Sequence, residues 1–470
     1  MNKPILASLA LALAAPFWAS AATPVDIDGL RQELDGLRTE YEARLRTLEH
    51  RLKAAEDAAA AASSAPQPAS TPPRPAAEAA PAPEAASPAP AARPAGSNAF
   101  NPSVSLILSG LYTRTSRDPA GYGLAGFPLP VGTEFGSGSR GLSLAETELT
   151  LAANIDPWWR GSASIALQRD DTVSVEEAYV QTSALGNGLA LKAGRFYSGV
   201  GYLNAQHSHR WDFVDNPLAY QAYLGTQFGD DGLQLTWLAP TDQYLAFGVE
   251  IGRGRSFPGA DNSRNGAGMT ALTAHTGGDI GESQNWRAGL SMLNVKANDQ
   301  ALSGPDSTTG ATSASGTFSG STRVLIADAV WKWAPNGNAT RTNLKLQGEY
   351  LRSKRRGRLA ADPDPTFADI RSVQSGWYLQ AIYQFIPRWR VGLRTERLDS
   401  GTVAFAPDVG FAQTSDYRPR RDSLMLDFNA SEFSRLRLQV AQDRSRPGSA
   451  DRQVFLQYQM SLGAHGAHGY

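Results

Sequence analysis

The chain has 470 residues and a nearly balanced charge, with 44 basic and 45 acidic residues, and it contains no cysteine. The lack of cysteine excludes disulfides, thiolate metal ligands and thiol nucleophiles. The balanced charge argues against a nucleic-acid partner, because proteins that bind nucleic acid normally carry a basic excess. One stretch alone is apolar enough to resemble a membrane helix, which excludes a polytopic helical membrane protein.

That apolar stretch lies at the N-terminus and has the layout of a secretory signal. Lys3 supplies a positive charge, residues 5–18 form a short apolar core, and Ala19, Ser20 and Ala21 provide a small-residue cleavage site. The core is too short for a membrane anchor, so we predict a signal peptide over 1–21. In a Gram-negative bacterium this prediction places the mature chain in the periplasm, the outer membrane or beyond.

Two segments without strand character follow the signal. Residues 22–62 carry an apolar seam at intervals of three and four, beginning with Ile27, Leu30 and Leu34, and the opposite face is charged. This spacing predicts a coiled-coil helix that associates with copies of itself, and a single amphipathic helix is the alternative. Residues 63–98 are rich in Ala and Pro, which predicts an extended linker.

From residue 99 to residue 470 the pattern changes to short runs of alternating apolar and polar residues. One such run places Leu245, Phe247, Val249 and Ile251 on one face of a strand. Gly, Pro, Asn and Asp separate the runs, and short and long connections mostly alternate along the chain. Short turns at one rim and long loops at the other are typical of a transmembrane β-barrel.

Counting the runs gives sixteen strands joined by seven turns and eight loops. A barrel of this size is wide enough for an aqueous lumen. The predicted fold is therefore all-β, a sixteen-stranded antiparallel transmembrane β-barrel preceded by a periplasmic coiled coil. The predicted short turns lie at 156–157, 186–188, 240–242, 281–285, 335–337, 387–388 and 430–434. Six of the eight predicted loops are long, at 115–140, 197–230, 253–268, 296–321, 353–374 and 399–421, and the other two are a tight one at 170–171 and a medium one near 447–448.

The layout resembles a bacterial outer-membrane porin, and in particular the phosphate-selective porin family. The matching stretches are Gly194-Arg195-Phe196, residues 199–202, and Phe213-Val214-Asp215 with Leu218. The resemblance implies a homotrimer in outer-membrane lipid, with a third loop that folds into the lumen as the constriction. It does not extend to phosphate specificity, because the lumenal arginine ladder of that family is not traced in this sequence.

The end of the chain, residues 463–470, is similar to that of proteobacterial outer-membrane proteins labelled zinc-responsive TonB-dependent receptors. The terminal Tyr470 suits the aromatic signal that, in such barrels, the outer-membrane assembly machinery reads. The resemblance therefore implies this machinery as a partner, and the coiled coil suggests peptidoglycan as a further candidate partner.

Charge is distributed unevenly along the predicted barrel. Residues 99–322 contain 13 basic and 20 acidic residues, whereas residues 323–470 contain 22 basic and 14 acidic residues. An arginine-rich wall opposite an acidic loop would set up a transverse field across the pore. Strand parity predicts that four basic residues point inward, and five further residues complete the predicted pore lining. The basic set is Lys345, Arg390, Arg394 and Arg437, and the remaining set is Glu148, Glu177, Arg210, Asp212 and Asp215.

Other basic residues are expected outside the pore. Lys354, Arg355, Arg356 and Arg358 fall within the predicted loop 353–374. We therefore expect these four side chains to lie in water.

His207 and His209 stand two apart in the predicted third loop. Alternate residues of an extended segment project to the same side, so the pair is a candidate Zn²⁺ or Cu²⁺ site. The alternative is ordinary polar lining that hydrogen-bonds the barrel wall, since two histidines without a fixed third ligand are weak evidence. His465 and His468 form a similar pair. We expect no resident cofactor, with zinc as the candidate ion.

The sequence holds no recognisable catalytic constellation, so we expect no enzyme activity. The favoured function is a porin, a channel for ion transport and for passive diffusion of small hydrophilic or anionic solutes. One alternative is a substrate-specific or metal-linked outer-membrane receptor. Another is a structural tether, in which the barrel anchors the coiled coil.

Overall fold

The computed structural model describes residues 102–463, apart from 133–134, 146, 169–171, 184, 261–264, 305–313, 362–366 and 407–415. The predicted signal peptide, coiled coil and linker lie outside the described residues, as do His465, His468 and Tyr470. No helix in the described part of the chain is long and apolar enough to cross a membrane.

Antiparallel strands make up most of the described chain. The strands are β1 Ser103–Thr115, β2 Leu129–Pro130, β3 Gly141–Leu144, β4 Thr147–Asn154, β5 Trp159–Leu167, β6 Val173–Thr182, β7 Leu189–Tyr197, β8 Gly229–Leu238, β9 Tyr244–Gly252, β10 Met269–Ile280, β11 Gln284–Gly304, β12 Ala314–Trp333, β13 Asn343–Ala361, β14 Phe367–Ile386, β15 Trp389–Ala406, β16 Arg420–Ser431, β17 Ser434–Arg444 and β18 Asp451–Gly463. The helices are η1 Pro119–Gly121, η2 Ser208–Arg210, α2 Leu218–Leu224 and η3 Pro335–Gly337.

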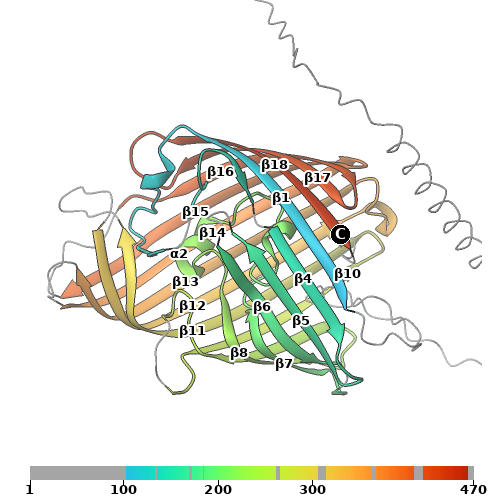
Figure 1. The fold of residues 1–470 in the computed structure, drawn as a ribbon, viewed down its shortest axis with the longest axis horizontal. Helices are drawn as coiled ribbons and strands as arrows, with labels where there is room; N and C mark the ends of the chain where they lie inside the picture. Colours follow the sequence, from blue (N-terminus) through green and yellow to red (C-terminus); the bar gives the residue numbers. More distant parts are fainter. Residues whose placement is uncertain are drawn as a thin grey trace, which may run out of the picture. The chain divides into compact units, whose positions relative to one another are not determined.

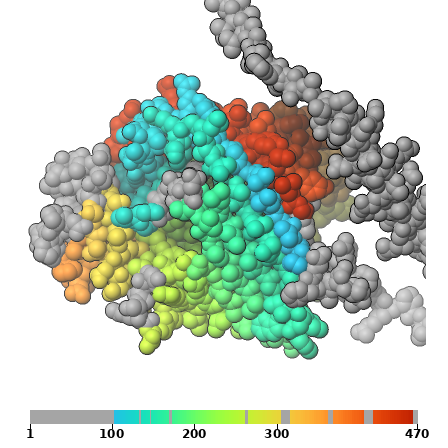
Figure 2. Space-filling model, in the orientation of Figure 1, coloured from blue at the N-terminus to red at the C-terminus, as the bar shows by residue number. Residues whose placement is uncertain are grey.

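These strands form a closed barrel, because the last strand pairs with the first. β18 pairs with β1, and each following strand pairs with its neighbour in the chain (Figure 1). β3 and β4 both pair with β1 and together occupy one position in the wall, while the two-residue β2 pairs with the far end of β11. The wall therefore has 16 spans, as predicted from the sequence. Figure 2 shows the blue and cyan first strand lying against both green and red segments of the chain.

Side chains alternate between the two faces of the wall. In β17 the polar Arg435, Arg437 and Gln439 are buried, whereas Leu436 and Leu438 are exposed. The same alternation of apolar side chains outside and polar side chains inside recurs in β16, β18 and β1. An apolar outer belt around a polar interior is what a barrel that crosses a membrane requires.

The seven predicted short turns are confirmed, but three predicted long loops are wrong in extent. Strands β11 to β15 run 18 to 21 residues and take in most of the segments 296–321 and 353–374 and the first part of 399–421. The outward-facing residues of these strand ends are mostly polar, as with Lys354, Arg356 and Arg358, whereas buried inward-facing residues such as Leu302, Phe318 and Leu359 are apolar. The apolar outer face that marks a membrane-spanning strand is therefore missing there.

The strand extension changes the place of four basic residues. Lys354, Arg356 and Arg358 lie in β13 with exposed side chains, not in a loop. Arg355 has the opposite parity, and its guanidinium lies 5.1 Å from the ring centre of Phe318.

The connection from β7 to β8, residues 198–228, supplies much of the main apolar core. Its Val200, Leu218 and Tyr220 pack with Val324 of β12 and Leu351 of β13. α2 lies among the strands of the barrel in Figure 1. We call residues 198–228 the third loop.

Candidate functional site

Hydrogen bonds tie the two ends of the third loop to each other. The side-chain amide of Asn204 donates to the carbonyls of Ser198 and Phe228, both at 2.8 Å, and its Oδ1 accepts from the Phe228 amide at 2.8 Å. The Gly199 amide donates to Glu250 of β9 at 2.8 Å. The loop therefore begins and ends at one fixed point on the wall.

Glu349 of β13 anchors the next stretch of the loop. Its carboxylate accepts hydrogen bonds from the amides of Tyr202 at 3.1 Å and Leu203 at 3.0 Å, and from the Tyr220 hydroxyl at 2.9 Å. Gly201 makes this approach possible, because its φ is +70° and a Cβ atom there would lie 2.4 Å from Glu349 Oε2. A side chain at position 201 is excluded on both counts.

Asp212 connects the loop to basic residues of two strands. Its carboxylate lies 2.7 Å from Lys345 Nζ of β13 and 3.4 Å from Arg390 Nη1 of β15. Gln380 of β14 also donates to it at 3.1 Å. Burial acts to raise the pKa of Asp212, but the charges of Lys345 and Arg390 outweigh burial and lower it. The carboxylate is therefore charged at neutral pH.

Asp215 makes the most deeply buried ion pairs of the loop. It lies 2.5 Å from Arg394 Nη2 and 2.7 Å from Arg421 Nη1, and these arginine side chains are 2% and 1% exposed. Glu396 bonds both arginines, at 2.7 Å and 2.9 Å, and accepts the Leu218 amide at 2.6 Å. Burial acts to raise the pKa of Asp215, but Arg421 and Arg394 outweigh burial and lower it to about 2.

Further arginines bind the loop backbone. Arg437 of β17 donates to the Trp211 carbonyl at 2.9 Å and pairs with Asp427 of β16 at 2.8 Å. Arg435 donates to the His209 carbonyl at 3.0 Å. The arginine-rich wall formed by β15, β16 and β17 thus holds the segment from His209 to Asp215.

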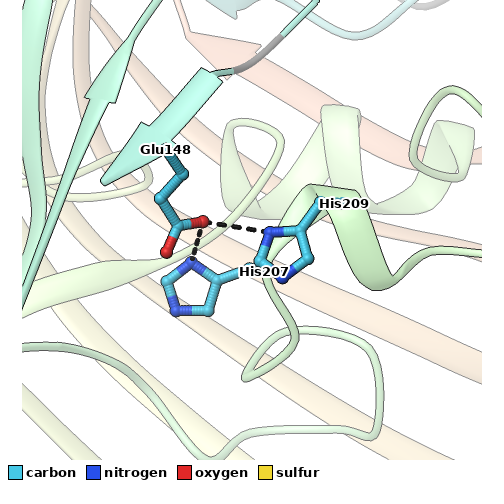
Figure 3. Close-up of side chains that lie close together, drawn as sticks. All are labelled: Glu148, His207 and His209. Carbon is cyan, nitrogen blue, oxygen red and sulfur yellow. Dashed lines mark ion pairs between the residues drawn. The ribbon is translucent and has the colours of Figure 1, made fainter. Parts of the chain in front are cut away.

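Two histidines of the third loop meet glutamates of β4 and β6. His207 Nδ1 and His209 Nδ1 lie 3.1 Å and 3.0 Å from the same atom, Glu148 Oε2 (Figure 3). His207 Nε2 lies 3.0 Å from Glu177 Oε2, and His207 Nδ1 lies 3.2 Å from Glu176 Oε2. The two imidazole rings stack with their centres 5.6 Å apart. We call these five residues the histidine–glutamate cluster.

A β-bulge explains why two consecutive glutamates face the same side. Ser164 of β5 pairs with Glu177, whereas Ile165 pairs with Val175, so Glu176 is the extra residue in β6. A bulge shifts the parity of a strand locally and re-aims a side chain. Without the bulge, Glu176 would point away from His207.

The surroundings shift the pKa values of the two histidines in this cluster in opposite directions. Burial acts to lower the pKa of His207, but the charge of Glu148 and the close contacts with Glu148, Glu176 and Glu177 outweigh burial and raise it well above its ordinary value. Burial lowers the pKa of His209, and the contact with Glu148 opposes that shift only in part.

The structure brings most of the residues expected in the pore into contact with the third loop. Asp212 meets Lys345 and Arg390, and Asp215 meets Arg394. Arg437 contacts the loop through the Trp211 carbonyl, and Glu148 and Glu177 meet the two histidines. Arg210 is half-buried at the end of η2, and among the described residues it has no ion-pair partner.

Sequence reasoning missed five residues that complete these contacts: Glu176, Glu349, Glu396, Arg421 and Asp427. Glu396 shares the parity of Arg390 and Arg394, so parity could have found it. Arg421 falls within the predicted loop 399–421, and Glu176 was not among the predicted pore residues, because neither the strand extension nor the bulge is visible in the alternation.

Comparison with known proteins finds no matching family model. An uncharacterized protein of Aquifex aeolicus (strain VF5) is 29% identical over 400 residues, covering 80% of this chain and 81% of its own.

Solved structures with a similar fold include outer-membrane proteins of three bacteria. A loop-deletion mutant of OmpT of Vibrio cholerae has a TM-score of 0.48 at 10% identity, with 77% of this chain and 99% of that chain covered. OprB of Pseudomonas putida has a TM-score of 0.48 at 13% identity, with 77% of this chain and 94% of that chain covered. An anion-selective porin of Comamonas acidovorans has a TM-score of 0.45 at 12% identity, with 77% of this chain and 99% of that chain covered. These values are too low to transfer a function to this chain.

Proposed function

We propose that this chain is an outer-membrane channel in which the third loop forms the constriction. The observation that carries the proposal is the set of contacts made by residues 198–228. The loop bonds β9 and β13 through Glu250 and Glu349, β15 and β16 through Arg394 and Arg421, and β4 and β6 through Glu148 and Glu177. A loop fixed to walls on several sides of a barrel divides its lumen.

The outer and inner faces of the wall support a channel in a membrane. The outer face carries an apolar belt, and charging it would cost about 2–4 kcal/mol per basic residue near the bilayer centre. The inner face carries buried polar side chains such as Gln347, Gln380 and Gln439. A polar interior favours passage of small hydrophilic solutes and ions.

We further propose that charge selectivity is weak. Lys345, Arg390, Arg394 and Arg437 each have a carboxylate within 2.8 Å, so their charges are largely compensated. Arg210 is the candidate for a remaining anion-attracting charge, and phosphate specificity is not part of the proposal. Self-association rests on the apolar seam predicted over 22–62, which does not distinguish a dimer from a trimer, and the homotrimer rests on the resemblance to porins.

Liposome swelling tests the proposed diffusion function. Vesicles that contain the refolded chain are placed in iso-osmotic solutions of uncharged sugars of increasing size. We expect swelling with small sugars and a steep loss of rate as the sugar grows. Impermeability of correctly folded protein to the smallest sugar would contradict a diffusion channel and favour the structural tether.

A further inference from the structure

We propose that Glu148, His207 and His209 form a binding site for a divalent transition-metal ion of the zinc class. This site goes beyond the proposed channel function, because metal binding does not depend on whether the barrel conducts. The three ligand atoms are Glu148 Oε2, His207 Nδ1 and His209 Nδ1, which lie within 4.8 Å of one another.

The geometry of the three atoms fits an ion at their centre. Both imidazole nitrogens point at one carboxylate oxygen, at 3.0 Å and 3.1 Å, as Figure 3 shows. Among the described residues, no donor is aligned for a regular hydrogen bond to the buried Glu148 Oε2, although the two nitrogens lie this close to it. In a tetrahedral zinc site with bonds of about 2.0–2.1 Å, neighbouring ligand atoms lie about 3.3 Å apart. Small shifts of the side chains would therefore admit the ion.

The surroundings supply the outer contacts that orient metal ligands. His207 Nε2 is held by Glu177 Oε2 at 3.0 Å, and Glu177 Oε1 in turn accepts the Tyr197 amide at 3.0 Å. Thr150 Oγ1 donates to the other oxygen of Glu148 at 2.7 Å. A carboxylate behind a ligating histidine fixes the tautomer of its ring and raises its basicity.

The charge and the donor types also point to such an ion. Three carboxylates, those of Glu148, Glu176 and Glu177, surround two imidazoles in a site where the Glu148 and His209 side chains are 3% and 5% exposed. A divalent cation would compensate this negative charge. Two nitrogen donors and one oxygen suit Zn²⁺, Co²⁺ or Cu²⁺, whereas Mg²⁺ and Ca²⁺ prefer oxygen ligands alone.

The competing explanation is a purely structural ion-pair cluster in which His207 carries a proton between the glutamates. The two explanations differ in what zinc does. A metal site binds one Zn²⁺ and depends on Glu148 and His209. A proton-only cluster takes up no zinc at these side chains.

The test uses the full mature chain, refolded in detergent, with His465→Ala and His468→Ala as background because those imidazoles would also bind zinc. Zn²⁺ affinity is measured by competition with a chelating dye, and Co²⁺ coordination by visible absorption. We expect one equivalent of Zn²⁺ and an intense tetrahedral Co²⁺ spectrum. Glu148→Gln and His209→Ala should each weaken binding at least about tenfold, and Glu177→Gln should weaken it by about 10–100-fold.

His275→Ala is the matched control, because His275 is also buried and its Nε2 lies 4.0 Å from Asp328 Oδ2, but within the described part of the chain it belongs to no cluster of three ligands. That variant should bind zinc as the background protein does. Circular dichroism and heat-modifiable gel migration establish that each variant is folded. The proposal is overturned if the folded background protein binds no Zn²⁺, or if Glu148→Gln and His209→Ala bind it unchanged. Conductance plays no part in this readout, so failure of the site and failure of the channel are distinguishable.

Discussion

At the scale of single residues, the contacts between the third loop and the wall depend on buried carboxylates with two or more cationic partners. Asp215 faces Arg394 and Arg421, and Asp212 faces Lys345 and Arg390. Removing one partner of a buried pair is costly, because the remaining charge stays desolvated without compensation. Such residues should therefore control how firmly the loop is held.

Asp215→Asn should loosen the loop strongly. The substitution leaves two buried guanidinium groups with Glu396 as their shared carboxylate, which costs about 3 kcal/mol. We expect a lower unfolding midpoint in urea and larger current fluctuations in planar bilayers.

The matched control is Asp422→Asn, because Asp422 pairs with Arg397 at 3.2 Å on the exposed surface and its side chain is 53% exposed. The control should lose less than about 1 kcal/mol. Equal losses for both variants would contradict the assigned role of Asp215.

Acid should release the same contact. The folded-state pKa of Asp215 is lowered to about 2, against about 3.9 in the unfolded chain. The ion pair therefore contributes its full stability above about pH 4, and that contribution is lost as the pH falls through about 2. We expect current fluctuations to increase between pH 4 and pH 2 in the native chain. Asp215→Asn should lack this step, and an identical pH profile in both proteins would exclude Asp215 as its origin.

At the scale of elements, the sequence predicted the strands and the short turns well, because period-two alternation and Gly, Pro and Asn punctuation are local signals. It failed where a strand continues beyond the membrane, as in β13 from Ser353 to Ala361, because no lipid imposes apolar residues on the outer face there. It also failed at Glu176, because a one-residue bulge changes which face of the strand a side chain points to, and no residue type in the sequence signals this bulge.

The candidate site was predictable in part. Inward parity identified Lys345, Arg390, Arg394 and Arg437, and the third loop was expected to contain Asp212 and Asp215. Which acid meets which base could not be predicted, because the loop joins residues about 180 positions apart, such as Asp215 and Arg394. His207 and His209 were a pair without a third ligand until the fold brought Glu148 to them.

The loop element itself should carry any anion preference through Arg210, which has no ion-pair partner among the described residues. A unit charge about 7 Å from a passing ion in a water-like dielectric contributes about 0.6 kcal/mol, or roughly a threefold change in permeability ratio. We expect Arg210→Gln to shift the reversal potential under a salt gradient toward cations by this amount. Arg323→Gln is the control, because Arg323 is exposed on the outer face and its Nε donates to Asn294 at 2.7 Å. An unchanged reversal potential in Arg210→Gln would remove Arg210 from the conduction path.

At the scale of the whole molecule, the apolar belt should determine stability in lipid. Leu438 lies on the outer face of β17, between Leu436 and Val440. Leu438→Arg should cost about 2–4 kcal/mol, and the matched Gln442→Arg, outward-facing nearer the rim, about 0–1 kcal/mol. Unfolding in phospholipid vesicles measures both. Equal costs would contradict the assignment of this face to lipid.

The central claim is that the chain forms a conducting barrel narrowed by its third loop, and single-channel conductance tests it most directly. The native protein is compared with a variant in which a short Gly-Ser linker replaces residues 207–225, which leaves the Asn204 hydrogen bonds at the base of the loop in place. We predict discrete small steps for the native chain and steps several-fold larger for the variant. Equal conductance in the two proteins, or silence of both when correctly folded, would contradict the account.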